Sequence, residues 1–172
     1  MKTVWQVILV VFILVVLTRL FIFDTFIVRG DSMAPSILPG DYILINKYTY
    51  RSHEPARGDI VVASPNDLNG AHLIKRIIAI PGETIDISKD QVVIRFSRED
   101  AGDVLQEPYI ANIGMPEIGI NHTNVDPFEY FVMGDNRYAS IDSRELGSIN
   151  SWDIKGKVIL TFRWRSFQFK AF

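Results

Sequence analysis

The chain has 172 residues and no cysteine. The absence of cysteine excludes disulfide bonds, a thiolate nucleophile and a zinc site built from thiolates. Histidine is also scarce, and His53, His72 and His122 show none of the short spacings of metal-binding helices, so we expect neither a metal nor another cofactor. The 18 basic and 20 acidic side chains leave a net charge of −2, which argues against nucleic acid as a partner. Any chemistry must therefore use oxygen or nitrogen side chains.

Long apolar runs are confined to the N-terminus. The segment from Val4 to Phe23 is almost entirely apolar, and at about 1.5 Å per helical residue it matches the roughly 30 Å hydrocarbon core of a bilayer. A cleavable signal peptide would have a shorter apolar region followed by small residues, which are missing here. The sequence therefore predicts a short cytoplasmic tail and an uncleaved transmembrane anchor at 1–23, crossing the cell membrane once. The positive charges favour only weakly an extracytoplasmic location for the rest of the chain.

Residues 24–172 have the pattern of one β domain. Short runs rich in valine, isoleucine, tyrosine and phenylalanine alternate with Gly, Pro, Asn and Asp, which are turn residues. The expected strands are 26–29, 41–47, 59–63, 73–80, 84–88, 91–96, 130–133 and 157–164. The stretch 97–127 is more polar, contains several glycines and prolines, and shows no sustained period. We expect it to form an inserted lobe or excursion of a mainly β protein.

Three stretches of the β domain stand out, although each is a weak signal alone. They are GDSMAPSILPGD at Gly30 to Asp41, IKRIIAIPGE at Ile74 to Glu83 and FVMGDNRYASIDSRELG at Phe131 to Gly147. In this order, behind an N-terminal apolar segment, they resemble the conserved boxes of bacterial type I signal peptidases in their shorter Gram-positive form. The resemblance implies antiparallel sheets and a membrane-bound serine endopeptidase that removes signal peptides from exported preproteins.

The two catalytic candidates are Ser32 and Lys75. By residue type alone, Ser32 is an ordinary loop serine, but the resemblance implies that it is the nucleophile. Lys75 interrupts an aliphatic run, and strand alternation places it on one face with Leu73 and Ile77. Desolvation there would lower the pKa of the amine, as a general base requires, whereas a lysine whose amine reaches water is the ordinary alternative. The resemblance favours the general base.

Residues 134–144 are expected to support this pair. By resemblance, Ser140 orients the lysine amine and Asp142 pairs within the surrounding network. Arg144 would then form a salt bridge with an acidic residue, either Asp135 or Asp142. A tight turn followed by a solvated loop rich in Ser, Asp and Arg is the alternative for this segment.

Substrate binding is expected beside the nucleophile. Some family members have a serine two residues before it, but this chain has Gly30 there, so the oxyanion hole would consist of the backbone N–H groups of Ser32 and Gly30. The extended segment before the scissile bond would add as a strand, with small apolar pockets that favour alanine. The residues expected to line these pockets are Ile27, Met33, Ile78 and Ile80.

Two other functions remain open at this stage. An accessory protein of this type could bind pilus or surface-protein subunits with little or no cleavage, and a self-cleaving Ser/Lys regulator would need a DNA-binding domain where this chain has an apolar segment. The expected partners are preproteins with small residues before the cleavage site and the lipid bilayer, and we expect a monomer. Residues 160–172 interleave aromatic and basic side chains, which suits either a lipid headgroup interface or a final strand with one buried face.

Overall fold

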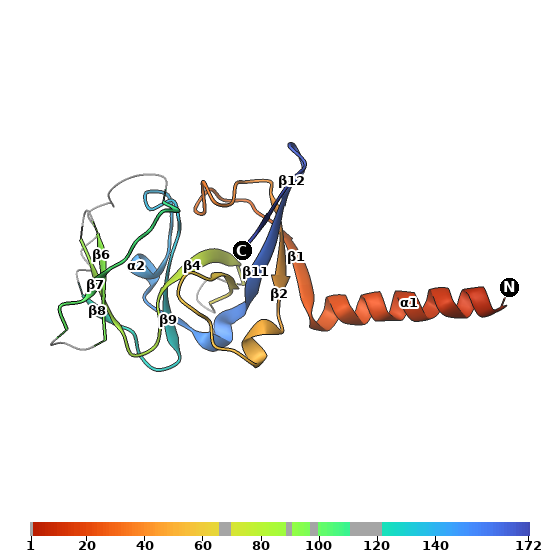
Figure 1. Ribbon diagram of the computed structural model, residues 1–172, viewed down its shortest axis with the longest axis horizontal. Helices are drawn as coiled ribbons and strands as arrows, with labels where there is room; N and C mark the ends of the chain where they lie inside the picture. The colour runs from red at the N-terminus through yellow and green to blue at the C-terminus, as the bar shows by residue number, and fades with distance from the viewer. Residues whose placement is uncertain (1, 66–69, 89–90, 97–99, 111–121) are drawn as a thin grey trace.

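The chain begins with a helix that runs directly into a β domain (Figure 1). This computed structural model describes residues 2–65, 70–88, 91–96, 100–110 and 122–172. Helix α1 (Lys2–Phe21) is followed after one residue by β1 (Phe23–Ile27), so the first strand starts earlier than the sequence pattern predicts. Among the residues described, no helix combines the length and apolar character that a membrane crossing requires.

The larger sheet has eight strands, and its paired strands are antiparallel. Seven of them follow the order β1-β2-β11-β3-β4-β9-β10, and β12 pairs with β11. Besides β1, their bounds are β2 Tyr42–Asn46, β3 Ile60–Ala63, β4 Leu73–Ala79, β9 Glu129–Met133, β10 Ile149–Asn150, β11 Ile154–Arg163 and β12 Gln168–Ala171. Strand β1 thus lies at an edge of the sheet, whereas β4 lies inside it, between β3 and β9.

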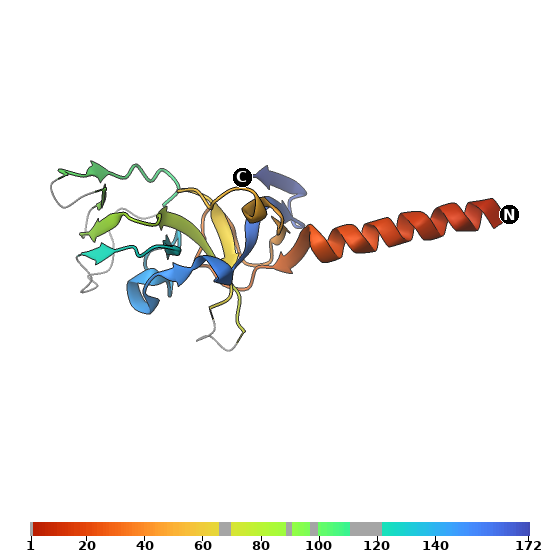
Figure 2. The same ribbon diagram turned by 90° about the horizontal axis from the view of Figure 1, so that it is seen from below.

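A smaller antiparallel sheet has the order β7-β6-β5-β8. Its strands are β5 Thr84–Ile87, β6 Val92–Arg95, β7 Asp103–Val104 and β8 Thr123–Asn124. Figure 2 shows this sheet at the end of the β domain opposite α1. Strands β7 and β8 come from the predicted excursion at 97–127, so part of that stretch completes the small sheet. Its residues 97–99 and 111–121 lie outside the described ranges.

Helical structure after α1 is short. Helix α2 (Ser143–Leu146) begins after Asp142, whose carboxylate accepts a hydrogen bond from the Arg144 N–H. In the part of the chain that the structure describes, 3₁₀ helices span Thr49–Arg51 and Ser151–Asp153. The prediction of a mainly β protein with antiparallel sheets behind an N-terminal helix is therefore confirmed.

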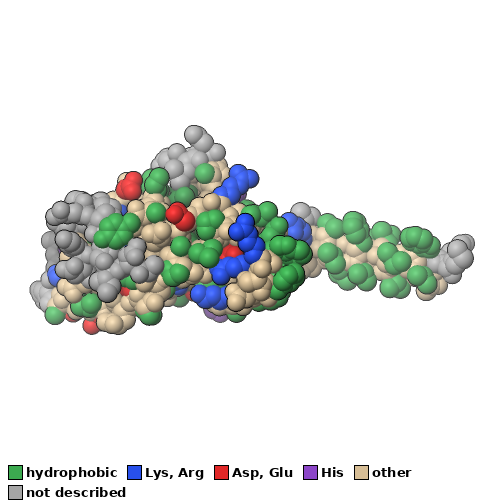
Figure 3. Space-filling model, turned by 90° about the horizontal axis from the view of Figure 1, so that it is seen from above, with side chains coloured by type: hydrophobic (Ala, Val, Ile, Leu, Met, Phe, Trp, Pro, Cys, Tyr) green, Lys and Arg blue, Asp and Glu red, His purple; other side chains and the backbone are tan. Residues whose placement is uncertain are grey.

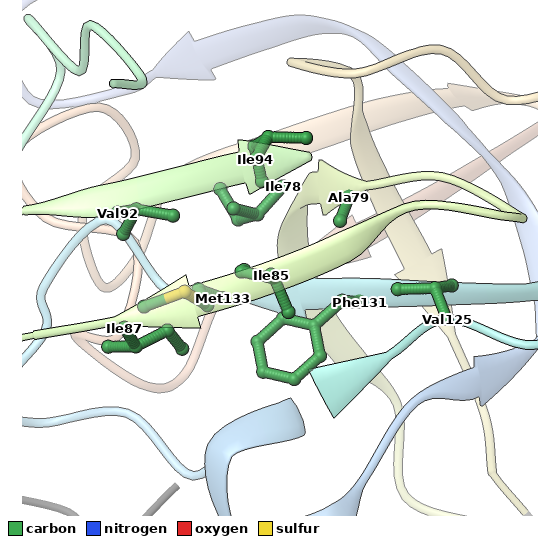
Figure 4. Packing of buried hydrophobic residues seen from close by; sticks show 9 residues of the cluster. All are labelled: Ile78, Ala79, Ile85, Ile87, Val92, Ile94, Val125, Phe131 and Met133. Atoms are coloured by element: carbon green, nitrogen blue, oxygen red, sulfur yellow. The ribbon is translucent and has the colours of Figure 1, made fainter. Parts of the chain in front are cut away.

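The apolar core lies in the β domain, whereas the large apolar side chains of α1 are exposed. The cluster in Figure 4 joins β4 and β9 of the larger sheet to β5 and β6 of the smaller one. A second cluster packs Met33 and Ile37, which follow β1, against β2 and β3. In contrast, the large apolar side chains of α1 between Val4 and Leu17 are 37–68% exposed, and Figure 3 shows α1 projecting from the domain. The helix therefore adds little to the core.

Candidate active site

Ser32 lies in the turn at 31–36 that follows β1. The next residue, Met33, is 1% exposed and packs in the second apolar cluster, so it fixes the turn to the core. On the other side, the Ser32 carbonyl accepts a hydrogen bond of 2.9 Å from the N–H of Asn136. The serine is therefore held between the apolar core and the turn at 134–137.

Lys75 lies on β4 and reaches the serine directly. Its amine nitrogen Nζ is 2.8 Å from Ser32 Oγ, although the two residues are 43 positions apart in the chain. Lys75 is only 3% exposed. Burial lowers the pKa of the amine to about 8, an effect that the charge of Arg144 reinforces and the charges of Asp142 and Asp135 oppose. A neutral amine in contact with a hydroxyl can accept its proton near physiological pH.

Asp142 is fully buried and organises the segment around it. Its carboxylate accepts hydrogen bonds from the Gly134 N–H (2.9 Å), the Ser140 hydroxyl (2.6 Å) and the Arg144 guanidinium (2.8 and 2.9 Å). Burial alone would raise the pKa of Asp142, but these hydrogen bonds and the Arg144 charge hold it below its ordinary value. Asp142 therefore stays ionised and adds negative charge near Lys75.

The structure settles which acidic residue Arg144 binds. Arg144 pairs with Asp142, whereas Asp135 accepts two hydrogen bonds from Arg76, of 2.9 and 2.7 Å. The Ser140 hydroxyl donates to Asp142, and within the described part of the chain it has no hydrogen bond to the Lys75 amine. The orienting role that the resemblance implies for Ser140 would thus act through Asp142.

Gly134 allows a close approach that any other residue would block. A Cβ atom there would lie 2.5 Å from the Ser32 carbonyl oxygen and 2.6 Å from Ser140 Cβ, and it would also meet Ser140 Oγ. These separations are far below van der Waals contact. The sequence pattern indicated only a turn at this position. Gly134 in fact brings Ser140 against the Ser32 backbone.

A cavity of about 750 Å³ opens beside the two catalytic candidates. Ser32, Lys75 and Gly30 line it, together with two of the four predicted pocket residues, Ile27 and Met33. The structure does not place the other two there: Ile78 is buried in the cluster of Figure 4, and Ile80 packs beside Tyr130 and Val132. Both follow Lys75 on or just after β4, but the strand carries them past the cavity.

Another part of the cavity lining was not predicted from the sequence. It includes Phe26 on β1 and residues 70–74, which lead into β4. The rings of Phe26 and His72 meet edge to face with centroids 5.0 Å apart. The only signal in the sequence was that residues 70–74 directly precede Lys75.

The backbone beside Ser32 is suited to binding an oxyanion. Within the described residues, the N–H groups of Ser32 and Gly30 have no hydrogen-bond partner. Gly30 lines the cavity, and the space where its Cβ would lie is open. No cluster of three or more histidine or acidic side chains in the described ranges is placed to hold a metal ion.

Comparisons with known proteins identify relatives of this chain. Residues 1–164 match the family "Signal peptidase, peptidase S26". A "Signal peptidase I P" from Bacillus subtilis subsp. natto is 35% identical over 159 residues, covering 90% of this chain and 85% of the relative. A "Signal peptidase I S" from Bacillus subtilis (strain 168) is 36% identical over 159 residues, covering 87% and 82%.

A crystal structure of a signal peptidase I from Enterococcus faecalis V583 is 30% identical to this chain. It matches with a TM-score of 0.49, covering 62% of this chain and 97% of that one. The family match over nearly the whole sequence and the identities of the Bacillus relatives decide the assignment. The chain belongs to the peptidase S26 family of signal peptidases, serine peptidases that remove signal peptides from preproteins.

Proposed function

We propose that this signal peptidase cleaves preproteins with Ser32 as nucleophile and Lys75 as general base. The observation that carries the assignment is the contact of 2.8 Å between Lys75 Nζ and Ser32 Oγ. A serine hydroxyl needs a base within hydrogen-bond distance to become a nucleophile. The buried amine, with its pKa lowered to about 8, meets that requirement.

The reaction would proceed by acyl transfer. Neutral Lys75 takes the Ser32 proton as Oγ attacks the carbonyl carbon of the residue before the scissile bond. The N–H groups of Ser32 and Gly30 would stabilise the negative charge that forms on the carbonyl oxygen. Lys75 then gives its proton to the departing amine, which is the new N-terminus of the mature protein. Water, deprotonated by Lys75, finally hydrolyses the ester between Ser32 and the signal peptide.

The cavity beside Ser32 would bind the segment that precedes the cleavage site. Strand β1 is an edge strand, so an extended peptide can pair with its free side. Such pairing directs alternate side chains into the cavity. Ile27 and Met33 contribute apolar walls to the cavity, and small residues before the scissile bond would fit against them.

We also propose that the enzyme works at a membrane surface. Signal peptidases are membrane-anchored, and the predicted single-pass anchor at 1–23 includes the exposed apolar side chains of α1. The β11–β12 hairpin would meet lipid headgroups through Trp164, Phe167 and Phe169, each more than 60% exposed. The β domain would then lie on the extracytoplasmic face, where preproteins emerge. A membrane-flotation assay with and without α1, and with the three aromatic residues changed to serine, tests both contacts.

The site needs only one chain, since the same chain supplies Ser32, Lys75 and the cavity. We therefore propose that the enzyme acts as a monomer. Light scattering of the detergent-solubilised protein, corrected for bound detergent, measures its mass. A dimeric mass at the concentration used for activity would contradict this.

The decisive experiment is cleavage of a preprotein with alanine before the scissile bond. The enzyme, Ser32→Ala and Lys75→Ala are compared from pH 6 to 10, with the exposed-site variants Ser52→Ala and Lys155→Ala as controls. We expect cleavage by the wild type and both controls, rising through about pH 8 as Lys75 loses its proton. Activity retained by Ser32→Ala or Lys75→Ala would refute the assignment. Binding of the preprotein without cleavage by any form would indicate an accessory assembly protein.

A further inference from the structure

A buried ion pair joins Arg137, in the turn at 134–137, to Glu107, and neither residue lines the cavity. Arg137 donates from Nη1 to Glu107 Oε2 at 3.0 Å and from Nη2 to the other carboxylate oxygen. The side chains of Arg137 and Glu107 are only 1% and 7% exposed. The two residues are 30 positions apart, so the pair joins the segment at 100–110 to the catalytic part of the larger sheet.

Tyr109 connects the same segment to a second arginine. Its hydroxyl donates to Glu107 Oε1 at 2.8 Å, and its ring lies 3.9 Å from the Arg76 guanidinium. Burial and the Glu107 charge raise the pKa of Tyr109, so the hydroxyl remains a donor at neutral pH. Arg76 in turn binds Asp135 through two hydrogen bonds. Glu107 and Tyr109 therefore contact one arginine each: Arg137 belongs to the turn at 134–137, and Arg76 binds Asp135 of the same turn.

That turn touches the nucleophile. Arg137 Nε donates to the Gly134 carbonyl at 3.0 Å, and Arg76 holds Asp135. Asn136 lies between Asp135 and Arg137 in the turn. Its N–H donates a hydrogen bond of 2.9 Å to the Ser32 carbonyl. A chain of buried, mostly charged contacts thus runs from Glu107 to the backbone of Ser32.

We propose that Glu107 and Tyr109 are positioning residues for the catalytic pair, acting through Arg137 and Arg76 on the turn at 134–137. The proposal rests on the assignment of Ser32 and Lys75 under the proposed function. Within the described ranges, neither Glu107 nor Tyr109 forms a hydrogen bond with Ser32 or Lys75. Glu107 keeps Arg137 oriented, because an arginine that loses its buried carboxylate must move or draw in water. Tyr109 holds Glu107 through its hydroxyl and packs its ring against Arg76.

A positioning role differs measurably from a purely structural one. Loosening the turn would move Ser32 away from the Lys75 amine, and small displacements of reacting groups slow the chemical step strongly. It would also admit water to Lys75, whose pKa would then rise from about 8 toward its ordinary 10.5. Loss of stability alone would change neither the rate per folded molecule nor its pH dependence.

The test uses the full chain in detergent and a preprotein substrate. Glu107→Gln and Tyr109→Phe are compared with Glu145→Gln and Tyr48→Phe, which change exposed residues of the same types. Rates are measured from pH 6 to 10 and normalised to the folded fraction from circular dichroism. Tyr109→Phe keeps the ring under Arg76 and removes only the hydroxyl, so it reports on the role even if Glu107→Gln does not fold.

For Glu107→Gln we expect kcat to fall by roughly 10- to 100-fold with a change in KM below about threefold. The apparent pKa of the rate should move upward. Tyr109→Phe should show the same pattern at roughly 2- to 10-fold in kcat, and Glu107→Asp should recover part of the activity. The exposed-site controls should match the wild type.

A double variant identifies the route of the effect. If Glu107 acts through Arg137, Glu107→Gln combined with Arg137→Met should be no slower than Arg137→Met alone. Unchanged kcat and an unchanged pH profile in folded Glu107→Gln and Tyr109→Phe would overturn the proposal. Ser32→Ala, assayed in parallel, separates the two hypotheses: residual activity there would refute the proposed function, whatever the Glu107 variants show.

Discussion

Buried charges around the turn at 134–137 are partnered in two different ways. Each of three buried arginines binds a carboxylate: Arg76 with Asp135, Arg137 with Glu107 and Arg144 with Asp142. On the cavity side, the amine of Lys75 is equally buried, but its hydrogen bond goes to the neutral hydroxyl of Ser32. Lys75 and Arg76 are neighbours on β4, so one residue step separates the two environments.

The difference shows how one strand can contribute both to a rigid frame, by which we mean the three buried arginine–carboxylate pairs, and to catalysis, through a general base. A guanidinium does not release its proton at any physiological pH, so a paired arginine serves to hold geometry. When a buried amine has no bound carboxylate, nothing offsets the free energy lost by removing its positive charge from water. The neutral form is therefore favoured, and the pKa of Lys75 is lowered. The charges of Asp142 and Asp135 limit the shift. Arginines paired with carboxylates therefore hold the geometry, and a lysine without a bound carboxylate can serve as the base.

The largest effect is expected from breaking the frame at Asp142. Asp142→Asn leaves the Arg144 guanidinium, which is 1% exposed, without its carboxylate. We expect the free energy of unfolding to fall by roughly 3–5 kcal/mol, the usual cost of breaking a buried pair from one side. Urea denaturation at pH 7 measures it. The exposed Asp126→Asn is the control, and a loss below about 1 kcal/mol would show that the pair contributes little to the frame.

The same carboxylate should give the protein an acid limit. Because the pKa of Asp142 is lower in the folded chain than in the unfolded one, its contribution to stability is present above the unfolded pKa. That contribution is lost as the pH falls through the folded pKa. Unfolding free energies of the wild type should therefore decrease below about pH 4 more steeply than those of Asp142→Asn. Parallel acid limbs for the two proteins would contradict this.

The next effect concerns the contact between frame and nucleophile. Gly134→Ala places a Cβ 2.5 Å from the Ser32 carbonyl oxygen, so the serine or the turn must move. We expect kcat to fall by roughly 10- to 100-fold, while most of the fold persists. Steady-state cleavage of the preprotein measures it. Adding Ser140→Gly makes room beside position 134, so the double variant should be faster than Gly134→Ala alone; no recovery would mean that the Ser32 carbonyl is the decisive contact.

The sequence predicts those features of the site that depend on residues close together in the chain, and it does not predict contacts between distant residues. The aliphatic run around Lys75 indicated a buried strand, and residues 134–137 indicated a turn, because both signals are local. The partner of Arg137 was not predictable, since Glu107 lies 30 positions away in a stretch without a regular period. Strands of two residues such as β7, β8 and β10 are too short for alternation to show.

Two of the four predicted pocket residues, Ile78 and Ile80, miss the cavity for a related reason. Alternation along β4 places Ile78 on the face opposite Lys75, but it cannot say which apolar cluster receives the side chain. The small sheet takes Ile78, and the cavity is closed instead by β1 and residues 70–74. Such choices follow from how the two sheets pack, which no single window of sequence contains.

A smaller change in the free energy of unfolding, in this case an increase, is expected when the buried amine of Lys75 is removed. Lys75→Met replaces the buried amine by an apolar side chain of similar length, so it should abolish cleavage and raise the free energy of unfolding at pH 7. The folded pKa of about 8 against 10.5 suggests a gain on the order of 1–3 kcal/mol. Urea denaturation measures it. A Lys75→Met protein less stable than the wild type would show that the hydrogen bond to Ser32 outweighs the desolvation cost.

The pH dependence of stability tests whether the buried Lys75 amine destabilises the folded protein. Between about pH 8 and 10.5 the unfolded chain binds a proton at Lys75 that the folded chain has released. Wild-type stability should therefore rise with pH across this window, and the slope should vanish in Lys75→Met. The exposed-site variant Lys155→Met should keep the wild-type slope.

The smallest effect tests whether burial or a short distance makes a charged pair stabilise the fold. His122 Nδ1 lies 2.6 Å from Asp86 Oδ1, a separation shorter than that between Arg144 and Asp142, but its side chain is 49% exposed. Water already solvates such a pair, so His122→Ala should change the free energy of unfolding by less than about 1 kcal/mol at low salt, and by less still at 1 M salt. Denaturation at both ionic strengths measures it. A loss as large as that of Asp142→Asn would mean that proximity, and not burial, stabilises the arginine frame.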